Sequence, residues 1–321
     1  MANRTNEIVQ LLEAVVKGQR DACECFAKKL VCIEAGLVNP DRPLGTFLLL
    51  GPTGTGKTLL TKTIASAYFS GRFARFDMSE YGEIHTTGRF VERMEAVCTA
   101  FSGERGLILF DEIEKANETL HKLFLQLLDE GRLSNVQNGT QMDFRNVLIC
   151  ATSNVGSREI ARTADSDYST IRSHILEQIR IIFSPEWLAR WGNTVIYRPL
   201  DRPAQRLIAE DMLRNEATFL KDRIANHSFT WHETLVNHLL DVGIDPVLGA
   251  RPLQRAIEDT LHLAIAEHSL DNPFGGDWVF GIENRIPRIV PKDRIGDLAR
   301  KPVSTSFSEI ANSYHQKVDS R

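Results

Sequence analysis

The chain has 321 residues, of which 42% are hydrophobic and 25% charged, and its formal net charge is −4 at pH 7. This length can bury one large core and a smaller second one, and the acidic balance gives no reason to expect DNA binding. No secretory signal opens the chain, and no apolar run is long enough to span a membrane. Five cysteines, an odd number, favour reduced thiols, so we expect a cytoplasmic enzyme.

The N-terminal part, residues 1–45, is predicted to be a helical lead-in. Helical periodicity covers residues 6–32 and breaks at Lys17, Gly18 and Gln19. Turn-forming residues at 39–45 then lead into the apolar run at 46–50, which has the pattern of a fully buried strand.

A phosphate-binding loop follows this strand directly, since residues 51–58 read Gly-Pro-Thr-Gly-Thr-Gly-Lys-Thr and a helix-like stretch starts near Lys57. The glycines let the backbone N–H groups point at phosphate oxygens. Lys57 would contact the β- and γ-phosphates of ATP, and the Thr58 hydroxyl would bind Mg²⁺. An ordinary glycine-rich turn is the alternative, but strand, loop and helix occur in the required order. The residues predicted to bind the nucleotide here are Gly51, Pro52, Thr53, Gly54, Thr55, Gly56, Lys57, Thr58 and Leu59.

Two carboxylates end a later buried strand. After a strand at 73–77 and a helix at 86–100, the apolar run at 107–110 leads into Asp111 and Glu112. In a parallel sheet this strand delivers both carboxylates to the edge that holds the phosphate loop. Asp111 would then hold Mg²⁺, and Glu112 would polarise the attacking water. A solvated acidic turn is the alternative for any lone Asp-Glu pair.

Further elements complete an α/β layered domain. The sequence predicts a helix at 117–129, a hairpin at 133–144 with Asn138-Gly139 at its turn, and a third buried strand at 146–151. From residue 201 onward the chain is mostly helical. We therefore predict an α/β domain with a mostly parallel sheet at residues 46–198, a helical domain at 199–283 that includes a short strand at 277–280, and a tail at 284–321 that is flexible or docks on a partner.

A series of motifs between residues 15 and 280 resembles one protein family. Besides the phosphate loop, the motifs are residues 16–19 (Val-Lys-Gly-Gln), 36–43 (Gly-Leu-Val-Asn-Pro-Asp-Arg-Pro), 77–81 (Asp-Met-Ser-Glu-Tyr), 111–116 (Asp-Glu-Ile-Glu-Lys-Ala), 128–133 (Leu-Asp-Glu-Gly-Arg-Leu), 143–146 (Asp-Phe-Arg-Asn), 152–154 (Thr-Ser-Asn) and 249–253 (Gly-Ala-Arg-Pro-Leu). With these motifs the chain resembles the ATPase modules of the Clp ATPases in the AAA+ superfamily, most closely the second module of ClpA and ClpB. The resemblance implies an AAA+ P-loop fold with a three-layer large domain and a small helical lid domain, and a ring-shaped homo-oligomer such as a hexamer.

The resemblance also implies roles for single residues. Asn154 resembles the sensor-1 residue that positions the attacking water, although a turn-forming Asn is the alternative. Arg251 resembles the sensor-2 arginine that reaches the phosphates, although an exposed arginine at a helix start is the alternative. Val15 and Val16 resemble adenine-pocket residues, and core packing would explain them equally well.

Arg190 is the residue with the largest consequence. The segment at 183–190 resembles the family segment whose last arginine enters the active site of the neighbouring subunit. A guanidinium supplied in this way stabilises the charge of the transition state. The alternative is an exposed Arg190 that pairs with Glu186 on the same helix and needs no oligomer.

Two family features are missing from the sequence. The segment at 89–106 is short and contains no Gly-aromatic-Val-Gly loop, with which the threading Clp ATPases grip an unfolded chain. Residues 155–169 contain no Ile/Leu-Gly-Phe/Leu loop of the kind that docks on the ClpP peptidase, so we expect no ClpP partner.

Three functions stay open at this point. The first is an ATP-driven remodeller of a dedicated protein partner that does not thread its substrate. The second is a nucleotide switch or assembly scaffold. The third is a nucleic-acid-associated AAA+ accessory factor, which the acidic net charge and the lack of a recognisable DNA-binding module disfavour.

Overall fold

The computed structural model describes residues 3–135, 138–157, 168–224, 227–245, 248–272 and 274–298. The chain divides into two compact units. The first comprises Met1–Ala204 with Asp245–Arg251, and the second comprises Gln205–Ile244 with Pro252–Arg321. The loop around Arg251 therefore belongs with the α/β domain, although its sequence position suggests the helical domain. Among the described helices, none combines the length and apolar character needed to cross a bilayer.

A five-stranded parallel sheet forms the centre of the first unit. Its strand order is β2-β3-β6-β1-β7, and the strands are β1 (Gly45–Leu50), β2 (Phe73–Asp77), β3 (Gly106–Asp111), β6 (Val147–Ser153) and β7 (Asn193–Ile196). This confirms the three strands predicted at 46–50, 107–110 and 146–151. Since every strand runs in the same direction, all five carboxyl ends meet at one edge of the sheet.

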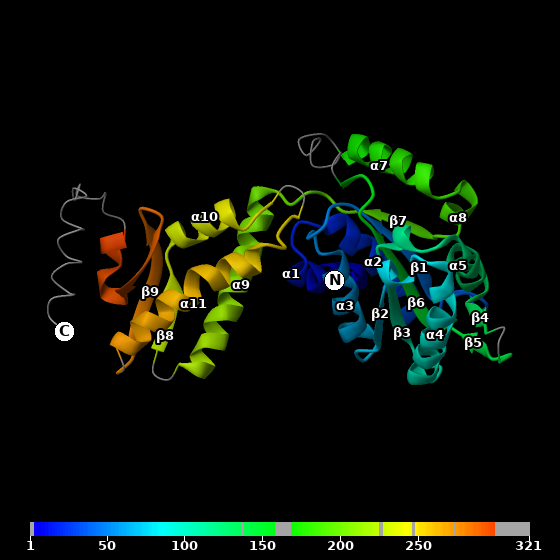
Figure 1. Cartoon of the computed structure of the whole chain (residues 1–321), viewed down its shortest axis with the longest axis horizontal. Coiled ribbons are helices and arrows are strands. Elements are labelled where there is room, and N and C mark those ends of the chain that lie inside the picture. The colour runs from blue at the N-terminus through cyan, green and yellow to red at the C-terminus, as the bar shows by residue number, and fades with distance from the viewer. Residues whose placement is uncertain are drawn as a thin grey trace. The chain divides into compact units, whose positions relative to one another are not determined.

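Helices cover both faces of this sheet (Figure 1), and an apolar core lies on each face. Alternate residues of β1 divide between the cores, because successive strand side chains point to opposite faces. Phe47 and Leu49 pack with helices α1 (Arg4–Val15), α2 (Arg20–Glu34) and α3 (Lys57–Tyr68). Leu48 and Leu50 pack with α4 (Thr87–Phe101), α5 (Glu118–Glu130), α7 (Tyr168–Ile182) and α8 (Pro185–Ala189). The predicted three-layer α/β architecture is confirmed.

Short elements connect these layers. The 3₁₀ turns are η1 (Met78–Tyr81), η2 (Ile84–Thr86) and η3 (Ile113–Lys115). The predicted hairpin is confirmed as β4 (Arg132–Ser134) paired with β5 (Gln141–Asp143). The segment predicted as a helical lead-in, residues 1–45, contains α1 and α2, and its Leu12 and Phe26 are fully buried in the core on one face of the sheet.

The second unit is helical, as predicted, and it also contains a small sheet. Its helices are α9 (Arg202–Arg223, whose first residues lie in the first unit), α10 (Glu233–Val242) and α11 (Leu253–Asp271). Its strands β8 (His227–Trp231), β9 (Gly276–Glu283) and β10 (Ile286–Pro291) lie in the order β10-β9-β8, and η4 (Lys292–Leu298) follows.

The predicted tail at 284–321 is wrong for its first part, because β10 pairs with β9 along its whole length. Two prolines, Pro287 and Pro291, conceal this strand in the sequence. An edge strand tolerates proline, because the missing N–H can face away from the ladder. Residues 299–321 lie outside the described residues.

Candidate functional site

The phosphate loop between β1 and α3 depends on its glycines. Gly51, Gly54 and Gly56 have φ angles of 136°, 70° and 99°, in the region that favours glycine. A Cβ atom on Gly51 would lie 2.6 Å from the Tyr197 carbonyl oxygen. Side chains at these positions are therefore excluded by both conformation and space.

Lys57, the first residue of α3, is folded back over this loop. Its side chain is buried, and its ammonium group donates to the carbonyl oxygens of Gly51 at 2.6 Å and Pro52 at 2.8 Å. Burial lowers the pKa of Lys57 to about 8, although the nearby carboxylates of Asp111, Glu114 and Glu112 oppose this shift. The cation is thus held at the loop by carbonyl dipoles that a phosphate group could replace.

Asp111 ends β3 and uses both of its carboxylate oxygens. The Thr152 hydroxyl, on neighbouring strand β6, donates to Asp111 Oδ1. Arg75, on the other neighbouring strand β2, donates to Oδ2 from Nε at 2.8 Å, and its Nη2 forms an ion pair with the same oxygen at 2.6 Å. The carboxylate is therefore fixed from both sides of its strand.

Glu112 leaves the strand conformation directly after Asp111. Its φ and ψ angles are 57° and 53°, in the left-handed region, and its backbone N–H donates to Thr152 Oγ1 at 3.1 Å. Its carboxylate accepts from Asn154 Nδ2 at 3.2 Å and pairs with the Lys115 ammonium at 2.5 Å. Both its backbone and its side chain are held in one orientation.

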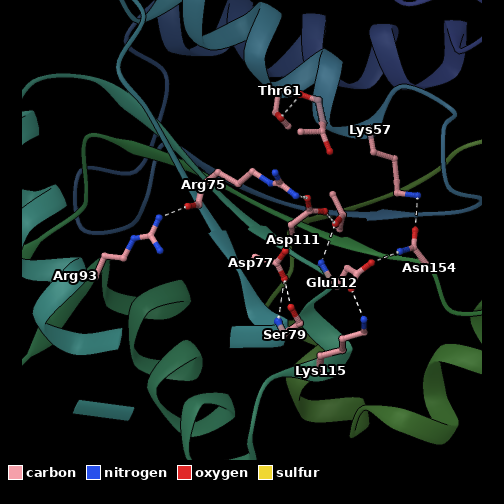
Figure 2. Close-up of polar contacts among 12 residues, drawn as sticks. Lys57, Thr61, Arg75, Asp77, Ser79, Arg93, Asp111, Glu112, Lys115 and Asn154 are labelled. Carbon is pink, nitrogen blue, oxygen red and sulfur yellow. Dashed lines mark hydrogen bonds and ion pairs between the residues drawn. The ribbon is translucent and has the colours of Figure 1, made fainter. Parts of the chain in front are cut away.

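Asn154 connects the phosphate loop to the carboxylates. Figure 2 shows its amide between Lys57 and Glu112, and its Oδ1 accepts from Lys57 Nζ at 3.0 Å. Its backbone N–H donates to Glu114 Oε1 at 3.1 Å. One amide therefore contacts both the predicted phosphate-binding cation and the predicted water-activating carboxylate.

Two oxygen donors near this edge are of the kind that a magnesium ion takes. Mg²⁺ prefers carboxylate, hydroxyl, water and phosphate oxygens, and it usually takes only one or two protein carboxylates. Asp111 at the end of β3 and the Thr58 hydroxyl in the first turn of α3 are such donors. Bound there, the ion would neutralise charge on the phosphates.

A second loop packs against the phosphate loop within the first unit. The Ala250 N–H donates to the Gly54 carbonyl at 3.4 Å, and a Cβ on Gly249 would lie 2.5 Å from the Thr53 carbonyl oxygen. Arg251 follows in this loop with an exposed side chain. The close backbone approach explains the glycine of this motif, and the role of Arg251 stays a prediction.

The two predicted adenine-pocket residues differ in their surroundings. Val16 is buried, and its Cγ1 atom would be 2.9 Å from a Cβ on Gly56 of the phosphate loop. Val15, the last residue of α1, is 43% exposed. Val16 therefore lies against the loop, while Val15 is exposed to solvent.

Arg190 lies apart from the residues joined at the sheet edge. It follows α8, and its guanidinium pairs with Asp129 at 2.7 Å and with Glu186 at 3.4 Å. The contact with Glu186 is the intramolecular alternative noted in the sequence, and the closer contact with Asp129 was not predicted. Neither partner belongs to the predicted nucleotide site.

Four side chains in this network were missed in the sequence. Thr152 and Arg75 hold Asp111, Lys115 holds Glu112, and Glu114 holds the backbone of Asn154. Thr152, Glu114 and Lys115 occur inside motifs that were recognised. Alternation along β2 could have pointed to Arg75, since Arg75 and Asp77 share a face of an edge strand.

Comparisons with known proteins agree with this geometry. The model of the AAA domain (Cdc48 subfamily) matches residues 42–193, and the model of the C-terminal, D2-small domain of ClpB protein matches residues 198–277. Chaperone protein ClpB 2 of Thermosynechococcus vestitus is 36% identical over 85% of the chain, and Chaperone protein ClpB 2 of Nostoc sp. is 38% identical over 83%. Chaperone protein ClpB of Vibrio vulnificus is 36% identical over 89% of the chain. These matches cover 32%, 32% and 34% of the three relatives, so the chain spans about a third of their length.

Proposed function

The chain belongs to the AAA+ ATPases of the Clp family, as a module like the second one of ClpB, and we propose that it forms an ATP-dependent ring that remodels a dedicated protein partner. An AAA domain followed by a D2-small domain, together with the ClpB relatives, makes the chain an ATPase. The contact of Asn154 with both Lys57 and Glu112 supports the ATP-hydrolysing part of the proposal, and the ClpB relatives support the ring and the protein partner.

The proposed chemistry assigns one role to each group at the sheet edge. The phosphates of ATP replace the carbonyl oxygens as partners of the Lys57 ammonium group, and its positive charge balances their negative charge. Glu112 accepts the proton of the attacking water, and Asn154 orients that water beside the γ-phosphate. Asp111 and Thr58 hold Mg²⁺, and Arg251 reports the state of the phosphates.

Arg190 is proposed to act in the active site of a neighbouring subunit. In its own chain it pairs with Asp129, which is not a residue of the nucleotide site. Both side chains are partly exposed, at 36% and 30%, so this pair can exchange for contacts with another molecule at a low cost. An oligomer would then be needed for full turnover.

The proposed remodelling does not involve threading. Between β2 and β3 the chain contains only η1, η2, α4 and short turns, and residues 89–106 lack the Gly-aromatic-Val-Gly loop. The force for remodelling would come instead from a change in the relative positions of Arg251 and Asn154 when the γ-phosphate leaves. A stable model protein incubated with the chain and ATP should therefore stay folded, and its global unfolding would contradict this part of the proposal.

Affinity capture with a Glu112→Gln chain tests the proposal most broadly. Loss of the water-activating carboxylate should trap the ATP-bound assembly together with its partner. The matched control is Lys57→Ala, which cannot hold ATP and should capture nothing. A partner captured equally by both variants, or by neither in the presence of ATP, would contradict the proposal.

A nucleotide switch is the second candidate, and the missing grip loop favours it equally. In that case ATP would hold the subunits together, and a single hydrolysis event would dissolve the assembly. Steady turnover by the assembled chain supports the remodeller. One turnover per assembly event supports the switch.

A further inference from the structure

Asp111 and Glu112 pose a geometric problem that the proposed function does not explain. Adjacent side chains of an extended strand point to opposite faces of a sheet. Both carboxylates are nevertheless proposed to act on one nucleotide. The chain meets this requirement by turning Glu112 into the left-handed region, with φ and ψ of 57° and 53°. A residue with a Cβ atom rarely adopts this conformation, so other contacts must hold it.

A single hydroxyl contacts both residues of the pair. Thr152 Oγ1 accepts the Glu112 backbone N–H at 3.1 Å and donates its own hydrogen to Asp111 Oδ1. A hydroxyl has one hydrogen to donate and two lone pairs with which to accept. The Asp111 carboxylate can only accept, so it takes the hydroxyl hydrogen. The Glu112 N–H can only donate, so it uses a lone pair of the hydroxyl oxygen, and the two contacts do not compete.

The place of Thr152 in the sheet makes these contacts rigid. It is fully buried on β6, the strand between β3 and β1, and it is paired in register with Leu49 of β1. The preceding strand residues Leu148, Ile149, Cys150 and Ala151 are apolar and buried. Valine has the same shape as threonine and suits a buried strand as well, so packing alone does not require the hydroxyl.

Two residues at the end of strand β6 therefore contact Glu112. Thr152 holds the backbone of Glu112, and Asn154, two residues further along, holds its carboxylate at 3.2 Å. We propose that Thr152 is a positioning residue for ATP hydrolysis, whose hydroxyl sets the directions of the Asp111 and Glu112 carboxylates. The inference rests on the proposed roles of Asp111 and Glu112.

The test compares Thr152→Val with Thr152→Ser. Thr152→Val keeps the shape but leaves the Glu112 N–H and one Asp111 oxygen without their partner. We expect kcat to fall by about tenfold or more, because the Glu112 carboxylate would lose the backbone contact that directs it at the attacking water. The Kd of a fluorescent ADP analogue measured without Mg²⁺ should change by less than about threefold, because Lys57 and the phosphate loop are unchanged. Thr152→Ser restores the hydroxyl and should restore kcat to within about threefold.

Thr234→Val serves as the control. It removes another hydroxyl that accepts a backbone N–H, that of Ile282 at 3.1 Å, and it lies in the second unit. It should lower the melting temperature without the fall in kcat. The inference is overturned if Thr152→Ser is as slow as Thr152→Val, if Thr234→Val loses kcat equally, or if Thr152→Val weakens ADP binding without Mg²⁺ by as large a factor as it lowers kcat. Parental turnover by Glu112→Gln would refute the proposed function itself, which is a separate result.

Discussion

The predicted site residues at the sheet edge contact one another within one chain, whereas the predicted site residue at the end of α8 does not contact them. At the sheet edge, Lys57, Asn154 and Glu112 already contact one another, and each also has partners from neighbouring elements. At the end of α8, the ion pairs of Arg190 within the described residues are with Asp129 and Glu186, and neither of these residues belongs to the predicted nucleotide site. Under the proposed function, one chain builds the nucleotide-binding and water-activating groups of the site, and a second copy supplies Arg190.

The largest effect is expected at Lys57. Replacing it by alanine removes the principal positive charge at the phosphate loop and should weaken ATP binding by about 100-fold or more. Isothermal titration of the purified chain with ATP and Mg²⁺ measures this directly. Lys62→Ala, which removes an exposed lysine of the same helix, is the control and should bind normally. Normal binding by Lys57→Ala would show that the nucleotide site lies elsewhere.

The same lysine predicts a pH dependence. In the nucleotide-free chain the pKa of Lys57 is lowered from 10.5 to about 8, mainly by burial. Above pH 8 the folded chain must therefore take up a proton to present a cation to the phosphates, and ATP affinity should fall by up to about tenfold per pH unit. Titrations in two buffers of different ionisation enthalpy would detect this proton uptake at pH 9. Affinity that stays constant from pH 7 to 9.5 would contradict the assignment.

The free energy of unfolding is expected to change with pH in the opposite direction to the ATP affinity. The unfolded chain keeps Lys57 protonated up to about pH 10.5, so between pH 8 and 10.5 it binds more protons than the folded chain. This lysine alone should therefore make the free energy of unfolding rise over that range. The penalty for burying its charge is fully present below pH 8. The difference between the parent and Lys57→Met, measured by urea unfolding without nucleotide, isolates this contribution.

A smaller effect is expected at Asp129. If Arg190 must leave Asp129 to reach a neighbouring site, then Asp129→Asn should lower the protein concentration needed for half-maximal turnover by about two- to fivefold, the usual strength of a partly exposed pair. Glu186→Gln removes the longer contact, at 3.4 Å, and should have less effect. A requirement for a higher concentration in Asp129→Asn would mean that Asp129 presents Arg190 instead of retaining it.

The phosphate loop, Asp111 and Asn154 could be predicted from the sequence because each follows the end of a buried strand. Apolar runs ending in a glycine loop, in Asp111 and in the segment before Asn154 show that the strands are parallel and buried, and parallel strands bring their carboxyl ends to one edge. The sequence could not show which side chains would meet across strands. Thr152 contacts Asp111 only because β6 lies beside β3, and that neighbour relation is a property of the folded sheet.

The second unit was harder to predict for a different reason. Its helices have strong periodicity, whereas β8 contains only five residues with mixed polarity and β10 contains two prolines. Both are edge strands around β9. Edge strands need less apolar character and tolerate proline, so local pattern describes them poorly.

A mixing experiment tests most directly whether a second copy completes the site. Arg190→Ala should lose about 10³- to 10⁵-fold in turnover, and Glu112→Gln should lose hydrolysis while still binding ATP. In a mixed assembly, the intact Glu112 of one variant can receive Arg190 from the other, so combining the two inactive chains should restore part of the ATPase activity. The account is contradicted if Arg190→Ala is as active as the parent, if the rate per subunit does not depend on concentration, or if the mixture stays inactive although the two chains assemble.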